Sequence, residues 1–375
     1  MYTPSFIQNP YVVYADNLST QGACYWDDSY HLWCVMSYKL ACEALTDQRL
    51  SSDTSSYLLA TTFPRHQRPM VEPLIDYFKH WLFYHDPPAH TQLRKHISHA
   101  FSQQAIAHYE SIVGNVVESV CSQLSGEYDF VAQVAEVIPA KVMARFLSLP
   151  EEDAALYVQW TLALSEFMDC HLRTPHEYQP ALAALNEQKK YFSARQNKWV
   201  LPDMHWTLLP MLLGTGIETT MTFLASGLHV LLKHPESWQR LQQQPDLLDR
   251  TIDELLRFEP PVHKTMRQAT VDFSYDHADI KKGDMVAIFL ASANRDPHIF
   301  ENPHEFNMAR EATLNLSFGY GIHYCLGRLL GRLVARDCFR YLLTHYPHMT
   351  LKNEPVSWHM GATLRRLTSL KIIMP

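Results

Sequence analysis

The feature that most restricts how this chain can fold is a glycine-rich segment, Ser317–Gly327 (SFGYGIHYCLG), which leads directly into a long amphipathic helix pattern. Its glycines permit backbone angles and close approaches that side chains would block. Cys325 falls where the loop becomes helix, and the free N–H groups of a helix start stabilise an anion. The segment therefore predicts a cysteine with a lowered pKa, and a thiolate is either a nucleophile or a metal ligand.

Three interpretations of Cys325 are open from the residues alone. A buried structural cysteine in a turn is the commonest case for a cysteine taken at random. A cysteine nucleophile requires a base and an orienting carboxylate from elsewhere in the chain. A heme-thiolate ligand requires room for a flat macrocycle against the loop, which the flanking glycines provide.

Helical spacing of apolar residues dominates the rest of the chain. Apolar residues recur at i, i+3 and i+4 through residues 89–125, 131–149 and 206–235. Alternating apolar and polar residues over 269–296 predict strands around a Lys-Gly-Asp turn, and residues 364–375 predict a closing strand. Residues 11–15 and 31–37 are candidates for two more strands. We expect a mainly α fold with a small β-sheet assembled from both ends of the chain, in a single domain over residues 1–375.

Composition excludes several classes of protein. With 47% hydrophobic and 19% charged residues, the 375-residue chain has a globular composition, and its net charge of −7 disfavours a nucleic-acid partner. The seven scattered cysteines include no C-x-x-C pair, which indicates a reduced, cytoplasmic protein and excludes the usual zinc spacings. The N-terminus has no secretory signal pattern. The most apolar segment, near 206–232, is interrupted by Pro210, Glu218 and glycines, so no membrane span is expected.

The cysteine loop resembles the heme-binding signature of the cytochrome P-450 family at every signature position, FG-x-G-x-H-x-C-x-G over residues 318–327. Three further segments agree with that family in order: HDPPAHTQLRKHISHAF at 85–101, GTGIETT at 214–220 and ELLR at 254–257. The resemblance extends from about Tyr84 to the C-terminus and is weakest in the first seventy residues and between Cys170 and Pro210. It implies the cytochrome P-450 fold, one domain that encloses a heme, of the soluble bacterial type.

The resemblance assigns heme-binding roles to individual residues. Cys325 corresponds to the axial thiolate of heme b (iron protoporphyrin IX), whose donor strength favours O–O cleavage. His90 and Arg94 lie four apart, hence on one helix face, and correspond to a pair that binds the heme propionates. The remaining residues that the resemblance assigns to heme binding are Arg267, Phe318, Gly319, His323 and Gly327.

Glu218 and Thr219 correspond to the catalytic acid–alcohol pair on the oxygen-activating helix of the family. Burying an acid and an alcohol in an apolar helix costs free energy, so their presence favours a functional role. The resemblance implies that they hold water and relay protons. The alternative is that the hydroxyl bonds back to the carbonyl four residues earlier and the acid pairs structurally. Gly216 would allow this helix to loosen, and Thr215 is either a substrate contact or another back-bonded hydroxyl.

Glu254 and Arg257 correspond to a buried structural ion pair behind the heme. The family usually completes it with a basic residue at the position that Glu305 occupies here, and His304 or Arg310 are candidate substitutes. The segment before the oxygen-activating helix is short, and residues 151–199 would form the lid of the active site. By analogy the pocket is lined by residues 77–84, with Phe78, Trp81 and Phe83 either pocket or core, and by Leu212, Thr215, Val262, His263 and Phe289.

These assignments predict a monomeric heme-thiolate monooxygenase that inserts one oxygen atom from O2 into an apolar or aromatic small molecule, in specialised metabolism. Electrons would come from a separate ferredoxin or flavodoxin docked near Arg328 and Arg332, although a solvated helix face explains those arginines equally well. The alternatives are a peroxide-using or non-oxygenating heme-thiolate enzyme and a heme sensor. The acid–alcohol pair at Glu218 and Thr219 disfavours both.

Overall fold

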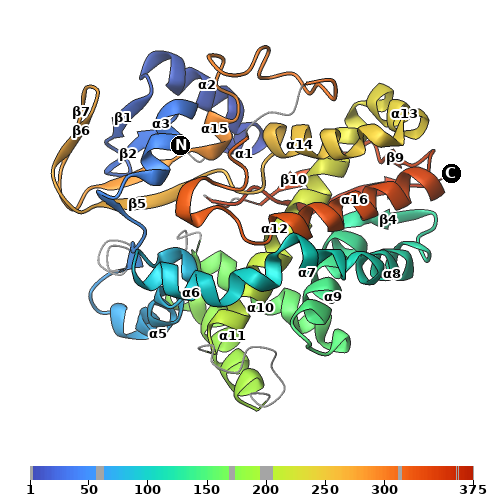
Figure 1. Cartoon of the computed structure of the whole chain (residues 1–375), viewed down its shortest axis with the longest axis horizontal. Coiled ribbons are helices and arrows are strands. Elements are labelled where there is room, and N and C mark those ends of the chain that lie inside the picture. The colour runs from blue at the N-terminus through green and yellow to red at the C-terminus, as the bar shows by residue number, and fades with distance from the viewer. Residues whose placement is uncertain are drawn as a thin grey trace.

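The computed structural model describes residues 3–55, 63–168, 174–194, 206–310, 315–359, 361 and 363–374. The fold is mainly α with small sheets, as the sequence predicts (Figure 1). The α-helices of the described parts are α1 (Pro4–Gln8), α2 (Pro10–Thr20), α3 (Tyr38–Thr46), α5 (Arg68–Lys79), α6 (Ala89–Ser98), α7 (Gln103–Ala107), α8 (Glu110–Cys121), α9 (Val137–Phe146), α10 (Ala154–Met168), α11 (Pro175–Ser193), α12 (Leu208–Lys233), α13 (Pro235–Gln243), α14 (Leu248–Phe258), α15 (Leu290–Ala293) and α16 (Arg328–His345).

The main sheet joins the N-terminal region to residues in the last third of the chain, as predicted. Its strand order is β1-β2-β8-β5-β3, and β2 pairs with β8 in parallel, whereas the other neighbours are antiparallel. The strands of this sheet are β1 (Cys24–Asp27), β2 (Leu32–Val35), β3 (Leu50–Ser51), β5 (Thr265–Ala269) and β8 (Met285–Ile288). The smaller sheets are formed by β6 (Phe273–Tyr275) with β7 (Ala278–Ile280), β10 (Ser357–Trp358) with β11 (Leu367–Ser369), and β4 (Glu127–Asp129) with β12 (Lys371–Ile373) and β9 (Thr350–Leu351).

The strand predicted over residues 11–15 is wrong, because this segment lies inside helix α2. Pro10 is the first residue of the helix, where its missing N–H and fixed φ angle are tolerated. Tyr11 and Tyr14 are three apart, so they lie on one helix face, and both are buried, while Val12 is exposed. The run of tyrosine and valine therefore belongs to a helix with one buried face rather than to a strand.

Helix α12 is the central helix of the fold, and most of its residues are buried (Figure 1). It packs against α9, α10 and α16, so it lies between the helices of residues 137–168 and the helix that follows the cysteine loop. It is long and apolar enough to cross a membrane by length and composition, but most of that apolar stretch is buried within the described structure. The prediction of one long helix over 206–235 is confirmed to within two residues at each end.

A buried ion-pair network lies behind the cysteine loop. Arg257 donates from Nε and Nη2 to the two carboxylate oxygens of Glu254 at 2.7 and 2.8 Å, and the Arg257 side chain is fully buried. Arg310 donates from Nε to the same carboxylate at 3.2 Å. Arg310, rather than His304, is therefore the third member of the network, because it reaches Glu254 from the loop that follows Glu305.

Hydrogen bonds carry this network to the loop. Arg257 donates to the carbonyl of Asn294 at 3.0 Å, and the Asn294 side chain accepts from the backbone N–H of Leu316 at 2.6 Å. The Ser317 hydroxyl accepts from Asn294 at 2.9 Å and donates to the carbonyl of Leu256 at 2.7 Å. The first residues of the loop are thus fixed to helix α14 by a continuous set of hydrogen bonds.

Gly321 is the glycine that the loop most clearly requires. Its φ angle is +72°, a left-handed conformation that favours glycine. A Cβ atom at this position would lie 2.8 Å from Cγ2 of Thr46 and 3.1 Å from the carbonyl oxygen of Leu45. The positive φ angle favours glycine, and the close packing of the loop against the end of helix α3 leaves no space for a Cβ atom.

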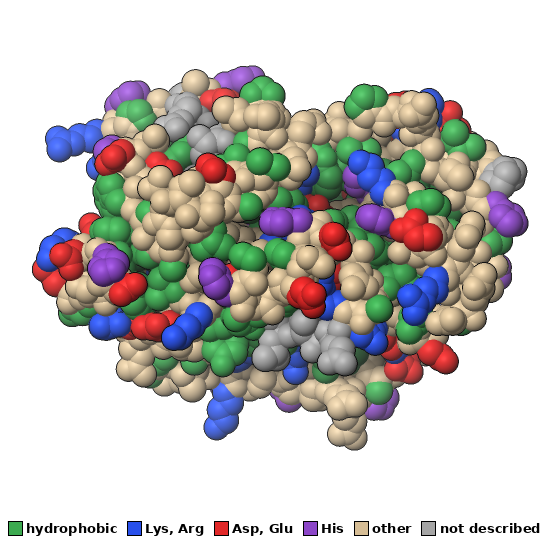
Figure 2. Space-filling view, turned by 90° about the horizontal axis from the view of Figure 1, so that it is seen from above, with side chains coloured by type: hydrophobic (Ala, Val, Ile, Leu, Met, Phe, Trp, Pro, Cys, Tyr) green, Lys and Arg blue, Asp and Glu red, His purple; other side chains and the backbone are tan. Residues whose placement is uncertain are grey.

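The surface carries charges of both signs. On the face seen in Figure 2, lysine, arginine, aspartate and glutamate side chains are interspersed among histidines and apolar groups, and no extended region of one sign is visible. This distribution agrees with the modest net charge of −7. Nucleic-acid binding typically uses clustered basic side chains, so this face gives no support to such a partner.

Candidate active site

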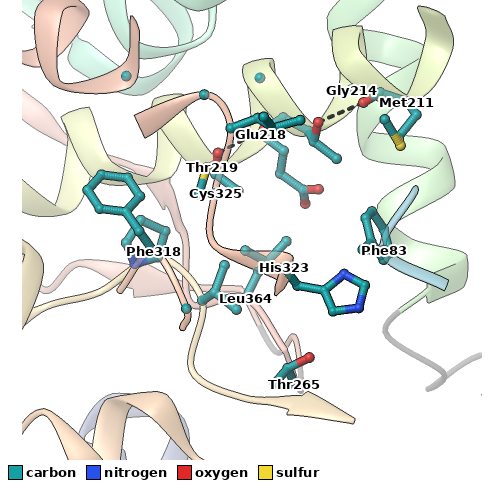
Figure 3. A pocket seen from close by; sticks show the side chains of 18 of the residues that line it. Phe83, Met211, Gly214, Glu218, Thr219, Thr265, Phe318, His323, Cys325 and Leu364 are labelled. Carbon is teal, nitrogen blue, oxygen red and sulfur yellow. Dashed lines mark hydrogen bonds between the residues drawn. The ribbon is translucent and has the colours of Figure 1, made fainter. Parts of the chain in front are cut away.

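A cavity of about 590 Å³ lies between the cysteine loop and helix α12. The loop contributes Phe318, Gly319, His323, Cys325 and Gly327 to its lining, and α12 contributes residues 210–220 in part. Figure 3 shows the Glu218 side chain directed from α12 into the space that His323 and Phe83 border. Segments about a hundred residues apart in the sequence therefore meet at one enclosed space.

Cys325 lies at the base of this cavity, just before α16 begins. Its backbone N–H donates to the carbonyl of Phe318 at 2.9 Å, which closes the loop on itself. Burial raises the pKa of the Cys325 thiol, while backbone hydrogen bonds from Gly327 and Arg328 and the charges of Arg328 and Arg94 act in the opposite direction. The prediction that the helix start lowers this pKa is therefore wrong for the polypeptide without a metal, because the effect of burial is larger.

The predicted basic residues gather at one end of the cavity. Arg94 and Arg267 line it, and the ring of His90 lies 4.3 Å from that of His323, centroid to centroid. Arg94 donates to the carbonyl of Tyr324 at 2.6 Å, and Arg267 donates to the carbonyl of Met266 at 2.8 Å. Within the described ranges, neither arginine forms an ion pair with an acidic side chain. Both guanidinium groups therefore line the cavity without a carboxylate partner.

Burial and mutual repulsion dominate the electrostatics of this cluster. Burial, followed by the charges of Arg267, His90 and Arg94, lowers the pKa of His323 to about 3. Burial lowers the pKa of Arg267 to about 10, an effect that Asp86 partly offsets. Burial and Arg94 also lower the pKa of His90. Each shift disfavours the positive form, and each would be relieved by an anion bound among these side chains.

The residues present fit a heme. The buried Nε2 atom of His90 has no hydrogen-bond partner in the described part of the chain, and buried polar atoms without partners are rare. Two arginines and two histidines at one end suit two carboxylates, and the Cys325 sulfur lies in the same cavity as a ligand for iron. An iron porphyrin would supply two carboxylates for the basic side chains and a metal ion for the sulfur.

The acid and the alcohol of α12 both line the cavity, and both have partners in the protein. The Thr219 hydroxyl donates to the carbonyl of Thr215 at 2.8 Å. The Glu218 side chain is buried and accepts a hydrogen bond from the Ser165 hydroxyl of α10. The alternative weighed from the sequence, a back-bonded alcohol and a structurally paired acid, therefore describes this geometry, and the proton relay stays a prediction.

Two other predictions concern the same helix. Helix α12 runs without interruption through Gly216, where a Cβ atom would lie 2.5 Å from the sulfur of Met143. The glycine thus permits close packing of α9 against α12, and loosening of the helix stays a prediction. The Thr215 hydroxyl lines the cavity but donates to the carbonyl of Met211 at 2.7 Å, the back-bond expected as one of two alternatives.

The predicted lining of the cavity is only partly correct. Leu212, Thr215 and Val262 line it, and so do Trp81 and Phe83 among the aromatic residues that sequence could not assign. Phe78 and Phe289 are instead buried core residues that do not border it. His263 accepts or donates toward the hydroxyls of Tyr11 and Tyr14 and is also absent from the lining. The short segment predicted before α12 lies outside the described residues.

Sequence reasoning missed polar residues that the lid helices contribute. Thr161 and Ser165 of α10 and Gln188 of α11 all line the cavity and are buried. Their signal in the sequence is weak. Ser165 and Thr161 are four apart in an apolar helix, and Gln188 replaces an apolar residue in the buried stripe of α11 formed by Ala181, Ala184, Leu185 and Phe192.

Comparison with known proteins agrees with this geometry. The family model for cytochrome P-450 matches residues 172–364. The chain is 30% identical to the polyketide biosynthesis cytochrome P-450 PksS of Bacillus subtilis (strain 168), with 92% of this chain and 89% of that protein covered. It is also 30% identical to the cytochrome P-450 monooxygenase PikC of Streptomyces venezuelae, with 98% and 91% covered.

A solved structure extends the likeness to the whole fold. The BioI cytochrome P-450, in complex with acyl carrier protein ligated to hexadec-9Z-enoic acid, superposes with a TM-score of 0.91 at 25% identity, covering 99% of this chain and all of that one. The chain belongs to the cytochrome P-450 family. It is a heme-dependent oxidoreductase of the monooxygenase type, with relatives in bacterial secondary metabolism.

Proposed function

We propose that this protein is a single-domain, cytoplasmic cytochrome P-450 that binds heme b through Cys325 and hydroxylates an apolar or aromatic small molecule in specialised metabolism. The observation that carries the proposal is the meeting of one cysteine sulfur, four basic side chains and the Glu218–Thr219 pair around one cavity. Heme supplies the redox chemistry that activates O2, and the protein supplies binding, orientation and proton control.

The basic cluster holds and orients the cofactor. Arg94 and Arg267 would donate charge-assisted hydrogen bonds to the propionates of a bound heme, and His323 would contribute from the loop side. The Ser52 hydroxyl lies 2.9 Å from Nε2 of His323 and fixes the ring against the cavity end. Binding of two carboxylates relieves the burial cost that lowers the pKa of His323 and of Arg267.

Glu218 and Thr219 control protons on the α12 side of the cavity. The Glu218 carboxylate is buried among apolar side chains and is held by Ser165, so water reaches it mainly through the cavity itself. The Thr219 hydroxyl donates to a helix carbonyl, and its two lone pairs remain available to accept a hydrogen bond from water. The pair can therefore hold an ordered water and pass its proton toward the heme face.

The substrate class follows from the lining of the cavity. The side chains over α12 and the lid helices are mostly apolar, among them Phe83, Met143, Leu164 and Leu212. The name of one relative, PksS, refers to polyketide biosynthesis, which supports a substrate of specialised metabolism. Electrons come from a separate ferredoxin or flavodoxin, which meets the monomer near Arg328, while Arg332 already pairs with Asp253.

The test is reconstitution of the purified holoprotein with a ferredoxin, its reductase and NAD(P)H. Ligands are first selected by their low-to-high-spin shift and are then tested for NAD(P)H-dependent incorporation of one labelled oxygen atom from O2. The proposal expects incorporation with the reductase system and none with the ferredoxin omitted. Product formation with hydrogen peroxide but not with NAD(P)H would replace it by a peroxide-using enzyme.

A further inference from the structure

The three helices over the cavity contribute few polar side chains, and most of those already have partners inside the protein. The Thr161 hydroxyl donates to the carbonyl of Tyr157 at 2.7 Å, as Thr215 and Thr219 do to carbonyls of their own helix. Ser165 donates to Glu218. These hydroxyl protons are used by the protein, so they are not the donors that would recognise a ligand.

Gln188 of α11 differs from them. Its side chain lines the cavity, and the residue is only 2% exposed. The Tyr77 hydroxyl of α5 donates to Oε1 of Gln188 at 2.6 Å, which fixes the orientation of the amide. The rings of Trp81 and Trp206 pack against Tyr77 at 5.5 and 5.6 Å between centroids, so the donor itself is held in place.

The amide nitrogen of Gln188 is left without an acceptor. An amide carries two N–H donors in addition to its carbonyl oxygen, and within the described ranges no acceptor bonds to the Gln188 nitrogen. Gln188 also lies in the buried stripe of α11, where its neighbours on the same face are alanine, leucine and phenylalanine. A polar group in such surroundings is costly unless it is hydrogen-bonded, so the cavity is the place from which a partner can come.

We propose that the Gln188 amide N–H is a substrate-recognition donor, and that the substrate is an apolar molecule with an uncharged oxygen acceptor, a ketone, ester or lactone carbonyl, at the end that meets α11. This inference rests on the proposed function, since it names the substrate class of the same cavity. A neutral acceptor matches a neutral donor. The Glu218 side chain of α12 lines the same cavity and the other lining residues of the lid are mostly apolar, so a charged acid is disfavoured as the ligand group.

The experiment compares two ligands with one carbon skeleton, 4-phenylcyclohexanone and phenylcyclohexane, on the holoprotein. Their dissociation constants are measured by spin-shift titration and by calorimetry in wild type, Gln188→Met and Gln67→Met. Gln67 is a matched control, because it is a buried glutamine at the start of α5 whose Oε1 accepts from Tyr178 of α11 at 3.4 Å, and it does not line the cavity.

We expect Gln188→Met to shift the ratio of the ketone and hydrocarbon dissociation constants by about three- to tenfold against the ketone, the effect of one neutral hydrogen bond. Gln67→Met should leave the ratio unchanged, and Gln188→Leu should reproduce the shift. An unchanged ratio in both Gln188 variants, an equal loss of both ligands, or failure of the ketone to bind wild type would overturn the inference. The reduced carbon monoxide spectrum of each variant tests the heme-thiolate site separately, so failure of the proposed function is recognised by itself.

Discussion

The two sides of the cavity are built in different ways. The cysteine side is fixed by polar contacts: a buried carboxylate that binds two arginines, and an asparagine and a serine that tie the loop to α14. It also contains Gly321, where a side chain would collide with the end of α3. The lid side is fixed by apolar packing, with a few polar groups such as Ser165 and Gln188 among hydrophobic neighbours. The cofactor side therefore depends on residue identity, whereas the substrate side depends mainly on volume and shape, with Gln188 as the proposed exception.

The largest effect on stability should come from the polar side. Glu254→Gln removes a buried negative charge and leaves Arg257 and Arg310 without their ionic partner, so we expect a loss of about 3–5 kcal/mol in the free energy of unfolding. Urea unfolding followed by tryptophan fluorescence measures it. The control is Asp253→Asn on the same helix, whose partly exposed pair with Arg332 should contribute less than about 1 kcal/mol. Equal losses in the two variants would show that the buried network around Glu254 contributes no more than a partly exposed ion pair on the same helix.

Arg94→Ala tests the same side through the cofactor. Removal of one charge-assisted hydrogen bond to a propionate should increase the rate of heme loss by about tenfold or more. Transfer of heme from the purified protein to apomyoglobin measures this rate. Lys95→Ala is the control, because Lys95 is the next residue of α6 and is exposed. If both variants keep heme as well as wild type does, Arg94 does not hold a propionate.

Packing between α9 and α12, on the side of the cavity opposite the cysteine loop, should respond to side-chain volume. Gly216→Ala places a methyl group against the Met143 side chain, so we expect a loss of about 1–3 kcal/mol in unfolding free energy. Gly214→Ala is the matched control on the same helix, since its nearest neighbour is the Thr161 hydroxyl at 3.8 Å, an ordinary contact. This substitution should be neutral or stabilise α12 by up to about 1 kcal/mol, because alanine favours helix over glycine. A loss in Gly214→Ala as large as in Gly216→Ala would show that Met143 is not the cause.

The smallest effect on stability, with a large effect on function, is expected for Thr219→Ala. Loss of its hydroxyl removes only a back-bond to Thr215, so the unfolding free energy should change by less than about 1 kcal/mol. Peroxide released per NAD(P)H oxidised should rise several-fold if the hydroxyl positions the proton-delivering water. Thr222→Ala, which removes a hydroxyl buried away from the cavity, should leave this ratio unchanged. Unaltered coupling in Thr219→Ala would count against the relay.

The same contrast explains which residues of the site could be predicted from the sequence. The loop around Cys325 and the Glu254–Arg257 pair are predictable because their function requires particular residues at fixed spacing in a short segment. Arg310 could be named only as one of two candidates, since its contact with Glu254 depends on the path of a loop. Gln188 was not predicted, because whether a helical residue faces a cavity or a neighbouring helix depends on a rotation that an apolar stripe does not define.

The strand wrongly expected at residues 11–15 has a related cause. Tyrosine and valine favour strands, and a run of them suggests a strand in spite of the proline that starts α2. The helix is stabilised by tertiary contacts that sequence does not reveal, since the Tyr11 hydroxyl donates to Glu259 at 3.0 Å and the Arg295 guanidinium lies 3.4 Å from its ring centre. Partners about 250 residues away thus decide the local structure.

Binding of the heme iron by the sulfur of Cys325 can be measured by the reduced carbon monoxide difference spectrum. Wild type should give the strongly red-shifted band of a thiolate-ligated heme, and Cys325→Ala should lose that band while the arginines and histidines of the cavity stay in place. The same red-shifted band in Cys325→Ala, or a wild-type protein that carries heme without it, would contradict the account.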